Sequence, residues 1–463
     1  MRTERDSMGE MQVPEDALYG ASTQRAVFNF QISNWTMPPS FLMALGLVKE
    51  ACAAVNQRSG ALPEILAKPI ITAASELRKG KWLEQFPVDV FQTGSATSTN
   101  MNANEMIAQR AGQLSNLQIH PNDHVNLGQS SNDVIPTVLH ISIVLGLKEQ
   151  LLPALVKMQS ELTRLAKKFE PIFKLGRTHL QDATPIRLGQ VFSGYAAQIE
   201  DAYHRLALAK ESLYSLAIGG TAVGTGLNTT AEFGKAVSAE IAAITGLPFY
   251  ETKNHFSAQA AMDHVLHFFG VLKTTAVTLT KIANDIRFLA SGPRAGYGEL
   301  KLQPLQPGSS IMPGKVNPVM CEMLMQVCAF VIGAESMASS STMILSNFEL
   351  CVSLPLLAWS GLESIRILSS GITAFSNDAL SGLEADGDRC TEQIDRSLAM
   401  CTALVPIVGY DKAAEIAKTA YQTNRTVIEA AREQVSVSAE ELKRIFDPAA
   451  MTMPSLTVKP GGG

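Results

Sequence analysis

The chain has 463 residues, of which 46% are hydrophobic and 17% are charged, and its formal net charge at pH 7 is −5. The apolar share excludes a disordered or low-complexity chain, because such chains are poor in apolar residues. The weakly acidic balance gives no reason to expect a nucleic acid or an anionic membrane as partner. A large chain with so little charge is expected to cover apolar surface by subunit association.

The first residues and the cysteines carry no targeting or metal-binding pattern. Residues 1–10 are charged and lack the apolar core of a secretory signal. No unbroken apolar run approaches the length of a membrane span. The six cysteines include no CxxC pair and no zinc-like pairing with histidine. We therefore expect a cytoplasmic protein with free thiols, no metal and no membrane partner. The tail after Leu456 is expected to be disordered.

Three regions follow one another along the chain, and helix dominates. Residues 1–131 mix short helical patches with polar loops. In residues 132–385, apolar residues recur at three- and four-residue spacing, which predicts amphipathic helices. Residues 386–463 return to short helices. Neither GxGxxG nor GxxxxGK[ST] occurs, so no dinucleotide or P-loop site is expected. The fold class is mainly α.

The middle region predicts five very long helices. The first begins near Asn132, and Pro153 is expected to kink or interrupt it. Helices this long exceed the diameter of a small domain and must pack lengthwise as a bundle. The other four are expected at 188–216, 257–290, 316–343 and 354–383. The shorter helices of the last region are expected at 388–403, 410–422, 424–435 and 439–446.

Four segments dense in glycine and small polar residues interrupt this apolar background. Each alone is ordinary loop and N-cap material. Each also adjoins a predicted long helix, and helix N-termini with hydroxyl groups bind anions well. Together they favour a site for a small carboxylate or phosphate. The segments are 92–100, 120–123 with 129–133, 176–182, and 308–318.

The segment 308–318 carries the most chemistry. Lys315 provides a compact cation and Asn317 both a donor and an acceptor. Ser309 is a poor base unless its alkoxide is stabilised, which backbone N–H groups of the loop can do. His179 is one of eight histidines, and a single histidine is usually structural. The polar residues around it favour a functional role, with a carboxylate such as Glu322 orienting the imidazole.

The segment Gly-Ser-Ser-Ile-Met-Pro-Gly-Lys-Val-Asn-Pro at 308–318 resembles the signature GSSxMPxKxNP of the fumarase/aspartase superfamily. Within it, the chain is similar to the class II fumarate hydratases. His179 stands where aspartases typically have glutamine, and Gly314 where they usually have alanine. Argininosuccinate and adenylosuccinate lyases share the serine loop but match the other motifs poorly. Those other motifs extend over nearly the whole chain and lie at 6–10, 18–26, 219–228 and 291–296.

The resemblance implies a mainly α protein of three domains, at 1–131, 132–385 and 386–463. The central five-helix bundle would assemble into a homotetramer with a 20-helix core. Each active site would then be shared among three subunits. No cofactor and no metal are implied.

The implied activity is the reversible, metal-independent hydration of fumarate to (S)-malate in the tricarboxylic acid cycle. Ser309 would remove the C3 proton of malate to give an aci-carboxylate. His179, paired with Glu322, would handle the proton of the departing hydroxyl or incoming water. A secondary dicarboxylate site would comprise His120, Asn122 and Asp123. The substrate carboxylates would be held by Ser95, Thr97, Ser130, Ser131, Asn132, Ser310, Lys315, Asn317 and, from another subunit, Thr178.

Some positions depart from the family pattern. Leu117 stands where many members carry a basic residue ahead of the secondary site, and Ala96 occupies a position that is commonly glycine. Two alternative functions remain open. An aspartate ammonia-lyase would use the same serine loop, and only His179 and Gly314 speak against it. A catalytically silent member would keep the fold, but the complete set of catalytic residue types argues against it.

Overall fold

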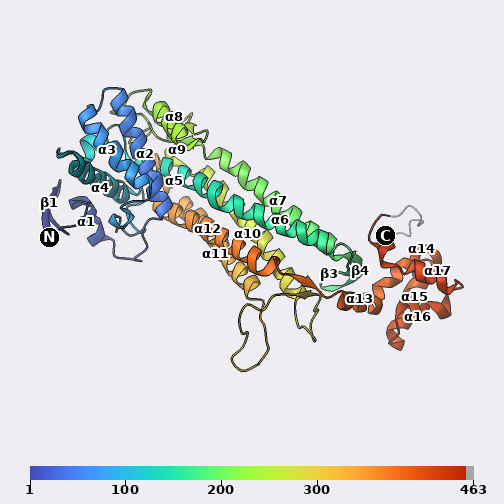
Figure 1. Ribbon diagram of the computed structural model, residues 1–463. Helices are drawn as coiled ribbons and strands as arrows, with labels where there is room; N and C mark the ends of the chain where they lie inside the picture. The colour runs from blue at the N-terminus through green and yellow to red at the C-terminus, as the bar shows by residue number, and fades with distance from the viewer. Residues whose placement is uncertain (455–463) are drawn as a thin grey trace. The chain divides into compact units, whose positions relative to one another are not determined.

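The structure is a computed structural model that describes residues 1–454, so the tail after Leu456 lies outside the described residues. Helix dominates, as Figure 1 shows along the chain. The chain forms two compact units. The first unit comprises Met1–Pro153, Ala202–Val277 and Val327–Ser370. The second unit comprises Ala154–Asp201, Thr278–Gln326 and the described residues from Gly371 onward.

The helices alternate with short loops through both units. The α-helices are α1 (Ala21–Asn29), α2 (Pro39–Arg58), α3 (Glu64–Arg78), α4 (Thr97–Ser115), α5 (Ser131–Gly146), α6 (Leu152–Lys168), α7 (Leu188–Ser212), α8 (Phe233–Thr245), α9 (His255–Ala260), α10 (Asp263–Leu289), α11 (Val319–Leu345), α12 (Leu354–Phe375), α13 (Gly387–Arg396), α14 (Val405–Val408), α15 (Tyr410–Thr423), α16 (Val427–Gln434), α17 (Ala439–Ile445) and α18 (Pro448–Met451). The 3-10 helices are Leu83–Gln85 and Leu398–Leu404, and the π-helical turns are Pro121–Val125, Leu147–Leu151 and Ser376–Leu380.

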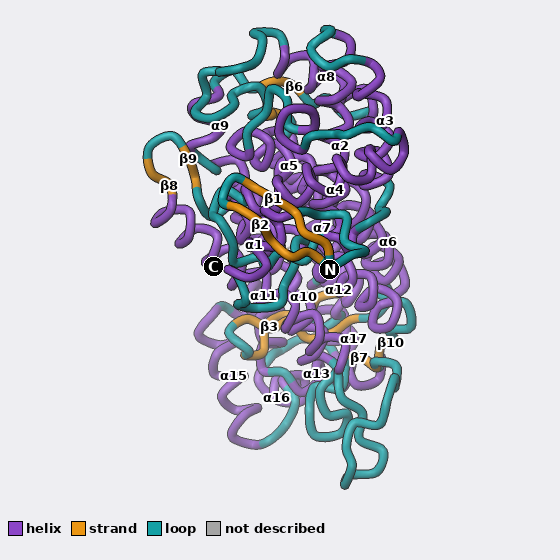
Figure 2. Tube along the Cα trace, turned by 90° about the vertical axis from the view of Figure 1, so that its left-hand side faces the viewer, coloured by secondary structure: helices purple, strands orange, loops and turns teal. Residues whose placement is uncertain are grey.

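Strands form only two-stranded pairs within the described residues, and Figure 2 draws them in orange. The hairpin β3–β4 carries the predicted site residues Thr178 and His179 at its tip. The pairs are β1 (Arg2–Asp6) with β2 (Gly9–Val13), β3 (Phe173–Thr178) with β4 (Gln181–Arg187), β5 (Ser215–Leu216) with β6 (Tyr250–Glu251), β7 (Leu300–Lys301) with β10 (Glu384–Ala385), and β8 (Ser346–Asn347) with β9 (Leu350–Cys351).

The five long helical stretches predicted from the sequence are present, with corrected boundaries. Pro153 does not end the first, because a π-helical turn at Leu147–Leu151 precedes the proline and the helix continues to Lys168. A wider turn accommodates the missing N–H and the ring of proline. The single helix expected at 257–290 is instead α9 and α10, since Ala261 has extended backbone angles. The helix expected at 354–383 ends at Phe375 and passes into a π-helical turn.

The long helices contact one another within each unit. In the first unit, the side chain of Ile365 on α12 covers Gly146 at the end of α5. Lys273 on α10 also pairs with Glu335 on α11 at 2.8 Å. In the second unit, the Tyr195 hydroxyl on α7 donates to Asp285 on α10 at 3.0 Å. These contacts agree with the lengthwise packing expected of helices that cannot bury an apolar face alone.

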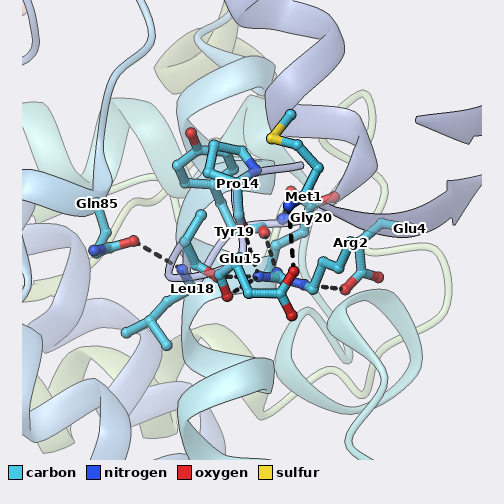
Figure 3. Close-up of polar contacts among 11 residues, drawn as sticks. Met1, Arg2, Glu4, Pro14, Glu15, Leu18, Tyr19, Gly20 and Gln85 are labelled. Atoms are coloured by element: carbon cyan, nitrogen blue, oxygen red, sulfur yellow. Dashed lines mark hydrogen bonds and ion pairs between the residues drawn. The ribbon is translucent and has the colours of Figure 1, made fainter. Parts of the chain in front are cut away.

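The N-terminal motifs hold the start of the first unit in place. Arg2 donates to the backbone oxygens of Ala17 at 2.6 Å and Tyr19 at 2.8 Å, and to the Glu4 carboxylate at 2.8 Å (Figure 3). At the next helix, the buried carboxylate of Glu105 on α4 accepts hydrogen bonds from the N-terminus of α1, including one from the Thr23 hydroxyl at 2.6 Å. A carboxylate at a helix N-terminus satisfies otherwise unpaired N–H groups. The motif at 18–26 therefore anchors α1 to α4, the helix that begins at Thr97.

Two helices of the last region are shorter than predicted. The helix expected at 388–403 ends at Arg396, where Ser397 adopts an extended backbone. The Ser397 hydroxyl then caps a separate 3-10 helix by accepting from the N–H of Ala399 at 3.1 Å. The helix expected from 424 begins at Val427, because Thr426 and Glu429 form a capping box.

Three helical stretches are long and apolar enough to cross a membrane by length and composition, although no unbroken apolar run marked them. They are Ser131–Lys168, Asp263–Leu289 and Val319–Leu345. Within the chain, 72%, 50% and 28% of their most apolar windows are buried, respectively. Packing within the chain thus buries most of the apolar surface of the first stretch, whereas much of the apolar surface of α11 stays uncovered.

Candidate active site

Three of the predicted substrate-binding hydroxyls of the first unit form one hydrogen-bonded chain. The Thr97 hydroxyl lies 2.7 Å from that of Ser95 and 2.7 Å from that of Ser131. Ser95 and Ser131 are buried. Ala96 precedes α4 in the left-handed backbone region, with φ of 54°, which accounts for the glycine common there. The N-termini of α4 and α5 thus meet through side-chain oxygens. Both ends favour an anion, because their first N–H groups have no partner within the helix.

The first turn of α5 is held by hydrogen bonds on both sides. Ser130 caps it by accepting from the N–H of Asn132 at 3.2 Å, while the Asp133 carboxylate accepts from the N–H of Ser130 at 2.9 Å. Asp133 is fully buried, and burial raises the pKa of its carboxyl. It also accepts from the N–H groups of Gly219 and Thr221, each at 3.0 Å. The motif at 219–228 therefore fixes the end of α5 that carries Ser131 and Asn132.

The predicted secondary site occupies the π-helical turn Pro121–Val125. The His120 ring accepts from the N–H of Asp123 at 3.0 Å, which orients the imidazole as a cap of this turn. Asn122 and Asp123 are exposed. The structure thus brings these three residues together on one short turn. Leu117, where a basic residue is common, follows the end of α4.

Thr178 and His179 lie at the exposed tip of the β3–β4 hairpin in the second unit. Thr178 pairs with Gln181, so His179 and Leu180 are the two central residues of the turn. Both have positive φ, 57° and 61°, which two-residue hairpin turns require and which non-glycine side chains rarely adopt. The turn therefore projects His179 away from the protein body in a strained conformation.

Below the tip, a buried charged cluster supports the hairpin. The Glu299 carboxylate is fully buried and pairs with Arg177 at 2.6 Å and with Lys174 at 3.1 Å. The Arg177 guanidinium lies 4.3 Å from the ring centre of Tyr297 and donates to Gln393. Burial lowers the pKa of the Lys174 ammonium. This cluster ties the hairpin that carries His179 to two other segments of the second unit.

Ser309 lies in an exposed loop whose two ends are joined by hydrogen bonds. The N–H of Gly308 donates to the Lys315 carbonyl at 2.8 Å, and the Asn317 amide donates to the Gly308 carbonyl at 2.8 Å. Within the loop, the Ser309 hydroxyl oxygen accepts from the N–H groups of Ile311 at 3.2 Å and Met312 at 3.1 Å. The loop therefore directs two backbone N–H groups at the Ser309 oxygen, the kind of donor that a serine alkoxide would need.

The loop also defines an open hollow of about 500 Å³ lined by residues 304–309 and 312–316. Ser310 and Lys315 are exposed in the same loop, and Asn317 is half-buried at its closure. Glu322 follows in the first turn of α11 and is also exposed. Within residues 1–454 of this one chain, no hydrogen bond or ion pair joins His179 to Glu322. The side chains of His179 and Glu322 are both exposed to solvent in the single chain.

Sequence reasoning did not single out the buried charged residues that support these loops. Lys49, Glu105, Asp133 and Glu299 are all buried, although such side chains are usually exposed. Spacing gives no signal for Lys49 or Glu299, since each finds its partners only in the folded chain. Asp133 sits three residues after Ser130, a capping spacing that does carry a signal. In the part of the chain that the structure describes, no three His, Cys, Asp or Glu side chains gather as a metal site.

Comparisons with known proteins identify the family of the chain. Residues 9–333 match the model of a lyase family, and residues 400–453 match that of the fumarase C C-terminus. The class II fumarate hydratase of Xylella fastidiosa (strain Temecula1) is 47% identical, covering 100% of this chain and 98% of the relative. That of Ralstonia nicotianae is 48% identical, with coverages of 97% and 99%. A crystal structure of class II fumarase from Schistosoma mansoni matches with a TM-score of 0.95 at 35% identity, covering 98% of this chain and 99% of that one.

The mainly helical fold and the serine loop thus define a lyase of the fumarase/aspartase type. Within that class, full-length identity near one half places the chain more narrowly. The chain belongs to the class II fumarate hydratase family. The predicted fold class and the family resemblance are both confirmed.

Proposed function

We propose that the chain catalyses the reversible hydration of fumarate to (S)-malate, a step of the tricarboxylic acid cycle. Family membership supports the reaction. The single structural observation that carries it is the Ser309 hydroxyl oxygen, which accepts hydrogen bonds from two backbone N–H groups of its own loop. These donors lower the energy of a serine alkoxide, so that a group that is ordinarily a poor base can take a weakly acidic proton.

In the malate-to-fumarate direction, Ser309 takes the proton from C3, and the electron pair left on carbon moves into the adjacent carboxylate. The aci-carboxylate formed carries a second negative charge, which the Lys315 ammonium and the Asn317 amide stabilise. The C2 hydroxyl then leaves as water with a proton from His179. Hydration runs through the same steps in reverse. Glu322 pairs with His179 in the assembled enzyme and holds the imidazole in the proton-transferring orientation.

The substrate carboxylates are bound by hydroxyl and amide groups rather than by a cluster of cations. The chain of hydroxyls from Ser95 to Ser131 and the capped N-terminus of α5 support this role, because they offer donors at a helix end that favours anions. Among the groups proposed, Ser130 is committed to capping and acts chiefly through backbone geometry. The full set is Ser95, Thr97, Ser130, Ser131, Asn132, Thr178, Ser310, Lys315 and Asn317. His120, Asn122 and Asp123 form the proposed secondary dicarboxylate site.

A homotetramer with active sites shared among three subunits is part of the proposal. The single chain leaves most of the apolar window of α11 uncovered. It also exposes the large apolar side chains of Met343, Ile344 and Phe348, with Phe348 91% exposed. Copies of the chain would cover such surface. We further propose the three domains 1–131, 132–385 and 386–463, a cytoplasmic location, and no nucleic-acid or membrane partner.

A direct assay tests the reaction. We expect purified protein to produce the absorbance of the fumarate double bond from (S)-malate, and to remove it when fumarate is supplied. Release of ammonia from aspartate is measured in parallel, since the ammonia-lyase alternative predicts it. Ammonia release without malate turnover would replace the hydratase by that alternative. No turnover of either substrate by folded protein would favour the silent member.

A further inference from the structure

Lys49 on α2 is a fully buried cation that the proposed reaction does not use. Its ammonium donates to the side-chain oxygens of Asn126 and Gln129, each at 2.9 Å. Both acceptors are neutral amides, and within residues 1–454 no carboxylate lies within ion-pair distance of the lysine. Burying an unpaired charge is costly. A buried lysine at this position therefore indicates a role other than packing.

The two amides that Lys49 contacts close the loop between the π-helical turn and α5. Asn126 donates to the Gln129 carbonyl at 3.2 Å, and the Gln129 amide donates back to the carbonyls of Val125 at 3.0 Å and Leu127 at 3.3 Å. The ammonium therefore donates to the oxygens of two amides whose N–H groups donate to backbone carbonyls of the loop. The ammonium reinforces, from the oxygen side, the orientation in which each amide directs its nitrogen to the backbone.

The same contacts connect the two helix N-termini of the proposed substrate site. The Asn100 amide, one turn into α4 after Thr97, donates to the Asn126 oxygen at 3.3 Å. Gln129 directly precedes Ser130, the cap of α5. Lys49 thus sits beneath both segments whose hydroxyls, those of Thr97 and Ser131, lie 2.7 Å apart.

We propose that Lys49 is a positioning residue for dicarboxylate binding, which rests on the proposed function: it clamps Asn126 and Gln129 so that the N-termini of α4 and α5 present their hydroxyls at binding distance. The lysine touches no substrate. Its effect passes through the loop at 126–130, whose Asn126 and Gln129 side chains it contacts. The titratable groups near it are Asp133 and Cys52; burial raises the pKa of the Cys52 thiol, which is therefore neutral, and burial lowers the pKa of the Lys49 ammonium to about 8.

The test compares the wild-type protein with Lys49→Met, which keeps the length of the side chain but removes its charge and its N–H groups. Phe41→Leu is the matched control, because it alters a fully buried side chain at the start of the same helix. We expect Lys49→Met to raise KM for fumarate and for malate at least tenfold while kcat changes less than threefold. Phe41→Leu should lower thermal stability and leave KM within twofold.

A binding readout separates this proposal from the reaction itself. Succinate, an unreactive dicarboxylate, should raise the Tm of the wild-type and Phe41→Leu proteins and raise that of Lys49→Met much less. If Lys49→Met fails to fold, Lys49→Gln is measured by the same two criteria. An unchanged KM and an unchanged succinate shift in the folded variant would overturn the positioning role. A wild-type protein that binds succinate but turns over neither substrate contradicts the proposed reaction and leaves the Lys49 comparison decisive.

Discussion

The Arg177 guanidinium donates at 2.6 Å to the fully buried carboxylate of Glu299, and His179 follows Arg177 by two residues at the hairpin tip. Only Thr178 separates the residue of the ion pair from the histidine. Because Glu299 also pairs with Lys174, one carboxylate compensates two buried cations. The stability of the hairpin that carries His179 thus depends on Glu299, because removing this carboxylate leaves both cations buried without a partner.

Glu299→Gln should lower both stability and turnover. Two cations would remain buried without a carboxylate, and breaking such a pair costs about 3–5 kcal/mol. We expect a clear fall in Tm and at least a tenfold fall in kcat for malate, measured at a temperature where the variant is folded. Glu392→Gln on α13 is the control, because Glu392 is exposed and pairs with Arg389 and Arg396 of its own helix, so its loss should change neither quantity. If kcat is the same in Glu299→Gln and Glu392→Gln, the buried cluster is not needed for the catalytic role of His179.

Ser309→Ala and His179→Asn should each lower kcat by several powers of ten with little change in Tm. Both residues lie in exposed turns outside the core, so neither substitution removes packing. The malate-to-fumarate absorbance assay measures kcat, and thermal unfolding checks the fold. Ser336→Ala, an exposed serine within α11, should behave as wild type. Activity of Ser309→Ala within tenfold of wild type would remove the serine from the role of base.

Two glycines of the serine loop should respond differently to alanine. A Cβ at Gly308 would lie 2.4 Å from the Lys315 carbonyl oxygen, so the closed loop must open. Gly314 has φ of 81° but open space around it, so alanine there adds only backbone strain of about 1 kcal/mol. We expect Gly308→Ala to lower kcat at least a hundredfold and Gly314→Ala less than tenfold in the malate assay. The reverse order would mean that loop closure does not set the position of Ser309.

The sequence predicted the parts of this molecule that local chemistry determines. Helix periodicity located the five long helical stretches, and dense polar segments located the hydroxyls at Thr97 and Ser131 and the loop around Ser309. One boundary failed where backbone geometry changed without a compositional signal, at Ala261. The interruption expected at Pro153 takes the form of the π-helical turn that precedes it. The buried residues that support the site were missed for another reason. Partners such as Lys49 and Gln129 lie 80 positions apart, and no spacing rule connects them.

His140 should make the protein less stable in mild acid. Burial lowers the pKa of its imidazole to about 4, and its Nδ1 lies 2.8 Å from the Ser215 carbonyl. An unfolded histidine, with a pKa near 6.5, binds a proton between pH 6.5 and 4 while the folded one does not, so the free energy of unfolding falls as pH falls through this range. The loss approaches about 3 kcal/mol at pH 4. In His140→Asn, whose amide can still donate to Ser215, we expect the stability difference from wild type to shift by that amount between pH 7 and pH 4. Denaturant unfolding at both pH values measures it, with the exposed His267→Asn as control. A constant difference would mean that His140 becomes protonated without unfolding.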